Sequence, residues 1–290
     1  MSNEVLVLSA DDTESLKNAH HLLSNPSWVA RAASMIGKPI EYGIDSLPDK
    51  AKLLIDDAVK KAMHAALEVA LKTMNNDVTE VTQVASTASN WWHKAAVATT
   101  GAVGGAFGFA ALAVELPIST TIMLRSIADV ARSEEADLND KKTQMECLQV
   151  LALGGPSKND DDAEIGYFAV RQAMTAAVQE AAAHVLTHGA SANAPALVRL
   201  LMQIAERFGI TVTEKVLVQA IPVLGALGGA AINTAFIDHF QDMAKGHFIV
   251  RRLEMKYGEA LIFAEYEKMS QVPDLKSLSL DSSTVPQSGI

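Results

Sequence analysis

The feature that most limits the fold of this chain is an uncharged, glycine-rich run at residues 95–114. It contains GAVGG at 101–105 and is followed by Glu115 and Pro117. A second uncharged run, residues 216–237, contains LGALGGA and ends before Asp238. Each run has the length of a membrane span, a membrane-inserting hairpin or a pair of tightly packed core helices.

Within both runs, glycines recur at a spacing of four residues, which places each pair on one helix face. Such pairs, a glycine zipper, let two helix backbones approach closely in a protein core as well as in lipid. The glycines expected at this contact are Gly101, Gly104, Gly105, Gly108, Gly225, Gly228 and Gly229. The six Leu, Ile, Phe and Val residues of the first run would contribute only about −3 kcal/mol to insertion. The sequence therefore favours buried core hairpins over reversible membrane insertion, and both over permanent spans.

The composition predicts an all-α fold. Hydrophobic residues make up 49% of the chain but aromatic residues only 5%, and alanine, the best helix former, dominates. No useful period-two strand pattern occurs. We expect a single domain of about eight helices with two glycine-rich helices at its centre. Its parts are a polar N-terminal arm with short helices at 1–48, the helical domain at 49–270, and a disordered tail at 271–290.

Several helices can be located. The clearest is amphipathic and begins at Asp49, and a helix beginning at Pro117 is expected to reach Arg132, because proline is tolerated in a first turn. That helix and the glycine-rich segment before it would form a hairpin or a kinked pair. Further helices are expected at about 163–187 and 194–208, and a helical stretch at 213–269 that only Pro222 and a few glycines interrupt.

Charge and cysteine content narrow the functional classes. The net charge of −10 argues against nucleic acid as a partner, since phosphate contacts need a basic face. The single cysteine, Cys147, excludes an internal disulfide. The first residues lack the basic and apolar regions of a signal peptide, so we expect a cytoplasmic protein. The partner that we expect is a membrane surface or a membrane protein, contacted through the glycine-rich hairpins.

The candidate catalytic residues are Glu115, Arg125, Asn233 and His239. A carboxylate at the end of an apolar run is costly unless it is paired. Glu115 is therefore either an acid/base group or metal ligand, or a surface or arginine-paired residue, and the second interpretation is favoured. Arg125 and Asp129 share a helix face, so an intrahelical ion pair is the default. Asn233 is more typical of a core amide bonded to a neighbouring helix.

Asp238, His239 and Asp242 form a candidate metal set on one helix. Their spacing offers two carboxylates and an imidazole to a divalent ion. HExxH is absent and no second motif supplies further ligands, so an exposed polar helix face is favoured. No other cofactor is expected.

His247, Arg251 and Arg252 belong to the most basic stretch of this acidic chain. One interpretation is a contact with a phospholipid head group or a phosphate. A solvated face near a helix end is the favoured alternative.

Three segments of the sequence resemble the EcsC family of bacterial proteins. They are ELPISTTIMLRSIADVAR from residue 115, CLQVLALGG at 147–155, and IPVLGALGGAAINTAFIDHFQDMAKGHFIVRRLEMKYG from residue 221. The resemblance covers about 50–265. The family takes its name from a protein encoded beside the subunits of an ABC transporter, and it has no established reaction to carry over. The resemblance implies a helical domain linked to transport, secretion or the membrane. The matching positions are Glu115, Pro117, Arg125, Gly154, Gly155, Gly228, Gly229 and Asn233.

Three functions remain open at this point. The first is a non-enzymatic protein that associates with the membrane surface or a membrane partner through its glycine-rich hairpins. The second is a hydrolase, metal-dependent and acting on lipid or peptide, built from Glu115, Asp238, His239 and Asp242. The third is a helical adaptor with an exposed apolar patch.

Overall fold

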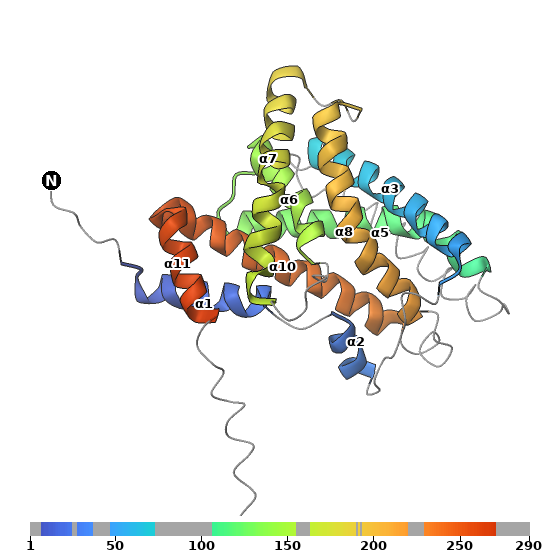
Figure 1. Cartoon of the computed structure of the whole chain (residues 1–290), viewed down its shortest axis with the longest axis horizontal. Coiled ribbons are helices and arrows are strands. Elements are labelled where there is room, and N and C mark those ends of the chain that lie inside the picture. The colour runs from blue at the N-terminus through green and yellow to red at the C-terminus, as the bar shows by residue number, and fades with distance from the viewer. Residues whose placement is uncertain are drawn as a thin grey trace, which may run out of the picture.

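The computed structural model describes residues 7–24, 28–36, 47–72, 106–154, 163–189, 191, 193–219 and 229–270. This part of the chain forms nine helices and no strand, so the all-α prediction is confirmed. Figure 1 shows how the helices are arranged. They are α1 (Ala10–Leu23), α2 (Trp28–Ile36), α3 (Asp49–Lys72), α5 (Ala106–Ser133), α6 (Lys141–Leu153), α7 (Ala163–His188), α8 (Pro195–Gln219), α10 (Gly229–Tyr257) and α11 (Glu259–Ser270).

Helix α6 lies at the centre of the core. Ten of its 13 residues are buried, and it contacts α3, α5, α7, α8 and α10. Asp140 caps its first turn, because the carboxylate accepts a hydrogen bond from the Lys142 backbone at 3.1 Å. A helix that is buried on nearly all sides needs little amphipathic character, and its neighbours surround it.

The amphipathic helix expected from Asp49 is confirmed as α3. Its buried face, which includes Ile55, Ala62 and Leu67, belongs to the main hydrophobic core. The helix packs mainly on α5 and also on α8. Leu53 lies outside this face and is 68% exposed.

The expectation of a new helix at Pro117 is wrong. Helix α5 runs without interruption from Ala106 to Ser133 and contains Pro117 in its interior. Proline lacks an N–H donor and costs about 3 kcal/mol inside a helix. The buried side chains of Leu116 before the proline and Met123 after it favour a continuous helix, because both belong to the same core.

The long C-terminal helical stretch is divided differently from the expectation. Helix α8 extends to Gln219, well beyond residue 208, and α10 then runs from Gly229 to Tyr257. Gly258 separates α10 from α11 with a φ of 90°, a conformation that favours glycine. In Figure 1, α10 crosses the molecule, with α1 and α11 beside its C-terminal part.

The first helix of the expected N-terminal arm packs on the helical domain. Leu16 and Ala19 of α1 are wholly buried, and α1 contacts α10 along its length. The two helices approach closely at Gly246, where an added Cβ would lie 2.6 Å from Cγ of Leu23. The disordered tail expected at 271–290 lies outside the described residues.

Among the described helices, none combines the length and apolar character that crossing a bilayer requires.

Candidate functional site

Glu115 and Lys215 form a buried ion pair between α5 and α8. Nζ of Lys215 lies 3.1 Å from Oε1 of Glu115, and the side chains are 1% and 10% exposed. Glu115 is the first charged residue after the run at 95–114, and Lys215 is the last one before the run at 216–237. The charged residue that follows the first uncharged run and the one that precedes the second therefore neutralise each other in the interior.

Further contacts join this pair to α2 and α10. Nζ of Lys215 lies 4.7 Å from the ring centroid of Phe236, a cation–π distance. The adjacent Glu214 accepts a hydrogen bond from Nε1 of Trp28 at 3.1 Å, and the Trp28 ring meets Phe236 edge-on at 5.3 Å. One turn of α8 thus holds α2, α5 and α10 together. We call Trp28, Glu115, Glu214, Lys215 and Phe236 the Glu115 cluster.

The Glu115 cluster lies near the beginnings of α5 and α10. Glu115 is nine residues after Ala106, and Phe236 is seven residues after Gly229. Both helices begin on the right-hand side of Figure 1. Five of the glycines expected at the helix contact lie outside the described residues: Gly101, Gly104, Gly105, Gly225 and Gly228. Gly108 and Gly229 are residues of α5 and α10.

Of the candidates Arg125 and Asn233, the first does not form its expected contact and the second does. Asp129 pairs with Arg132 at 3.0 Å and not with Arg125, so the expected Arg125–Asp129 pair is replaced. Nε of Arg125 is buried without a hydrogen-bond acceptor among the described residues. Asn233 accepts a long hydrogen bond from Gln219 at 3.5 Å, which is the expected contact between neighbouring helices.

The candidate metal residues have separate partners. His239 is buried, and its Nε2 lies 2.7 Å from the carbonyl oxygen of Gly154, so Nε2 donates. Asp242 pairs with Arg31 at 2.7 Å. No group of three or more His, Cys, Asp and Glu side chains suited to a metal occurs in the described helices. The Asp238, His239 and Asp242 set stays a prediction, and two of its members already bind protein groups.

The contact of His239 explains the first glycine of the LGG motif. A Cβ on Gly154 would lie 2.8 Å from Cε1 of Phe240 and 2.9 Å from Nε2 of His239. Nε of Arg207 also donates to the Ala152 carbonyl at 2.9 Å. The C-terminal carbonyls of α6 are therefore satisfied by side chains of α8 and α10.

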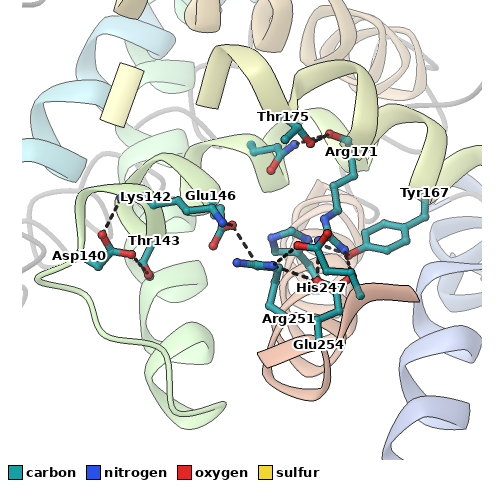
Figure 2. Close-up of polar contacts among 12 residues, drawn as sticks. Asp140, Lys142, Thr143, Glu146, Tyr167, Arg171, Thr175, His247, Arg251 and Glu254 are labelled. Carbon is teal, nitrogen blue, oxygen red and sulfur yellow. Dashed lines mark hydrogen bonds and ion pairs between the residues drawn. The ribbon is translucent and has the colours of Figure 1, made fainter. Parts of the chain in front are cut away.

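His247, Arg251 and Arg252 do not form the expected basic surface. His247 is wholly buried, and Figure 2 shows it with Arg251 in a network that joins α6, α7 and α10. Arg252 binds Glu134 at 3.2 Å, at the end of α5. Because both arginines face carboxylates and the imidazole faces the core, this stretch stabilises helix packing.

We call Glu146, Tyr167, Arg171, His247, Arg251 and Glu254 the His247 network. Arg171 of α7 binds Glu254 of α10 in a bidentate manner, at 2.7 and 2.6 Å. Arg251 lies 3.0 Å from both Glu254 and Glu146 of α6. Two arginines and two glutamates balance in charge, which reduces the cost of burying them.

The electrostatics of the His247 network favour a neutral imidazole. Burial holds the pKa of His247 well below its usual value, and Arg171 and Arg251 lower it further. Nδ1 lies 3.0 Å from the hydroxyl of Tyr167. Burial raises the pKa of Tyr167 and of Cys147, so neither is an activated nucleophile. The arrangement holds helices together and offers no evident chemistry.

Sequence reasoning missed the buried position of His247, although a signal existed. Met243, His247, Val250 and Glu254 recur at helical spacing, and all four are buried. This periodicity predicts a buried His247, whereas the charges of the neighbouring basic residues suggest an exposed surface.

Comparison with known families places the chain. The model of the EcsC protein family matches residues 13–253. The chain belongs to the EcsC family. This EcsC match begins inside α1, earlier than the resemblance seen at about residue 50, and so includes the helix that packs on α10. No curated protein and no solved structure matches the EcsC chain.

Proposed function

We propose that this EcsC protein is a peripheral membrane protein that contacts the bilayer through its two uncharged runs. The observation that carries the proposal is the ion pair between Glu115, which follows the first run, and Lys215, which precedes the second. The pair joins α5, which follows residues 95–105 in the chain, to α8, which precedes residues 220–228. Two weakly apolar segments at one place bind a surface better than either segment alone.

The electrostatics of the Glu115 cluster support the same function. A charge brought to the low-dielectric side of a membrane interface is costly unless it is paired. Lys215 neutralises Glu115, so the approach of lipid to this end leaves neither charge unpaired. The first run has only six large apolar residues, and one of them, Leu112, is buried in the core. An insertion energy weaker than about −3 kcal/mol fits reversible contact.

The cellular setting that we propose is the cytoplasmic face of a bacterial inner membrane, in transport or secretion. Its support is family membership, since the resemblance links the EcsC family to transport functions. This proposed location does not depend on the geometry of the Glu115 cluster. Fractionation of cells that express the protein tests it separately.

Vesicle flotation tests the membrane contact. Wild-type protein is mixed with neutral phosphatidylcholine vesicles or with vesicles that contain anionic phosphatidylglycerol, and is expected to float with one or both. Val103→Asp and Leu224→Asp place a charge in each run and are expected to reduce flotation at least about tenfold.

Leu186→Asp is the matched control, because Leu186 is 69% exposed and lies on α7, a helix that contributes no residue to the Glu115 cluster. This variant should float like wild type. Wild-type protein that remains at the bottom of the gradient with both vesicle types would overturn the proposed function.

A further inference from the structure

The first turns of α3 expose two neighbouring leucines. Leu53 is 68% exposed and Leu54 is 41% exposed, on a helix whose opposite side belongs to the main core. In the described part of the chain, no other large apolar side chains are exposed at consecutive positions. Isolated apolar side chains are normal at a protein surface, whereas apolar side chains that lie together mark interaction sites.

Lysines lie on the same face of α3 as the leucines. Lys50 is one turn before Leu54, and Lys60 and Lys61 follow the two leucines by seven residues, which is two turns. We call this outward side of the first turns the α3 face; it consists of Lys50, Leu53, Leu54, Asp57, Lys60 and Lys61.

The α3 face is basic, although the chain as a whole has a net charge of −10. Asp57, its one acidic residue, is paired with Lys61. Lys50 and Lys60 are exposed, and neither has a carboxylate within 4 Å among the described residues. Three lysines and one aspartate leave the face with a charge of +2, and over all of Asp49–Lys61 four lysines still outnumber three aspartates. Both unpaired lysines are therefore available to an anionic partner.

The α3 face lies at the end of the molecule where α5 begins. Helix α3 packs mainly on α5, and both helices begin on the right-hand side of Figure 1. Val114, the last residue of the first uncharged run, is 50% exposed near the beginning of α5. This end of the molecule thus presents apolar side chains to solvent from two helices.

We propose that the α3 face is a further bilayer contact, with its leucines among the upper acyl chains and Lys50 and Lys60 at the phosphates of anionic lipids. The inference rests on the proposed membrane function and names the lipid class that it selects. Apolar residues beside lysines are typical of helices that lie in the interface, because lysine stems reach from the apolar level to the head groups. An anionic surface repels an acidic protein, so a local basic face determines which side approaches.

Flotation over a series of lipid concentrations tests the α3 face, with vesicles of phosphatidylcholine alone or mixed with phosphatidylglycerol. Wild-type protein should bind the anionic vesicles at least about tenfold more tightly, because each unpaired lysine adds about fivefold. Leu53→Ser should weaken binding to both vesicle types about tenfold, since it removes a large apolar side chain from the interface. Lys50→Gln and Lys60→Gln should each weaken binding about fivefold with anionic vesicles only.

Leu186→Ser and Lys17→Gln are the matched controls. Leu186 is 69% exposed on α7, and the Lys17 side chain is 58% exposed on α1. They remove an exposed leucine and an exposed lysine from helices other than α3 and α5, so both variants should bind each vesicle type like wild type.

The outcomes separate this inference from the proposed function. If wild type floats and the Leu53→Ser and Lys50→Gln variants bind like wild type, the α3 face is overturned while the proposed function stands. Equal affinity of wild type for the two vesicle types would overturn the selection of anionic lipid. Wild-type protein that floats with neither would overturn both proposals. A change from dimer to monomer on Leu53→Ser, seen by sedimentation velocity, would show that a second copy covers the face and would also overturn the inference.

Discussion

Glu115 and Lys215 are 100 residues apart in the sequence and form an ion pair of 3.1 Å inside the protein. The pair connects the end of one uncharged run with the start of the other. In a core of this kind an unpaired charge is far more costly than a neutral pair. The contribution of the pair is therefore measured by removing its members singly and together.

Lys215→Met should lower the free energy of unfolding by about 3–5 kcal/mol, because it leaves the Glu115 carboxylate buried without its cation. The double variant Glu115→Leu, Lys215→Met should lose much less, since it buries no charge. Urea unfolding followed by circular dichroism measures both. A double variant whose loss equals the sum of the losses of Glu115→Leu alone and Lys215→Met alone would show that the two residues are not coupled.

Gly154→Ala should lower the free energy of unfolding by about 1–3 kcal/mol, because the new Cβ would overlap Phe240 and His239. Gly209→Ala is the control, since a Cβ there meets no atom within 4 Å. Gly209 is inside α8, so alanine should stabilise the protein by up to about 1 kcal/mol. Thermal unfolding of the two variants should shift in opposite directions.

Protein stability should fall as pH falls below about 6.5. The pKa of His247 is held well below this value in the folded state, so the unfolded chain binds more protons. The slope from this group reaches about 1.4 kcal/mol per pH unit. Burial also lowers the pKa of His239, which adds a contribution of the same sign.

His247→Asn isolates the contribution of His247. As pH falls from 6.5 toward 5, the unfolding free energy of wild type should decrease more steeply than that of this variant. Tyr167→Phe removes the hydroxyl that meets Nδ1 but keeps the buried imidazole, so it should retain the pH slope. A His247→Asn variant with the wild-type slope would contradict the prediction.

Asp12→Asn should loosen α1. The Asp12 carboxylate accepts hydrogen bonds from Lys256 and Tyr257, each at 2.7 Å, and from Ser9 at 2.8 Å. The bond from Lys256 is the main cause that lowers the pKa of Asp12, so its contribution is present above about pH 4 and lost below it. Amide exchange in α1 should become about tenfold faster while exchange in α3 stays unchanged.

Asp11→Asn is the matched control for that experiment, because Asp11 is exposed beside Asp12. It should leave exchange in α1 at the wild-type rate. Equal acceleration in both variants would mean that charge near the helix start, and not the contact with α10, controls α1.

The helices were predictable where one face of the sequence is apolar. Helix α3 begins at the predicted residue because its pattern is local and complete. Pro117 misled the prediction, because the rule for proline describes an isolated helix, whereas the burial of Leu116 before it and Met123 after it is a tertiary effect. The end of α8 was missed for the same reason, since Leu217 and Val218 are buried by other helices.

The pairings of charged residues were much less predictable. Spacing along one helix suggested Arg125 with Asp129, yet Asp129 binds Arg132. Lys215 as the partner of Glu115 could not be found locally, because the two belong to different helices. The interpretation favoured from the sequence, a surface residue or a partner for an arginine, is wrong for Glu115, which is buried and paired with a lysine.

The docking of α1 on α10 has a consequence for synthesis of the protein. About 200 residues separate Leu23 from Gly229, so at translation rates of about 5–20 residues per second the ribosome needs about ten seconds or more to deliver α10 after α1. During that interval the apolar side of α1, with Leu16 and Ala19, has no surface to cover it. The nascent chain therefore completes its fold only late in translation, and a chain truncated before α10 leaves its first helix open to chaperones and proteases.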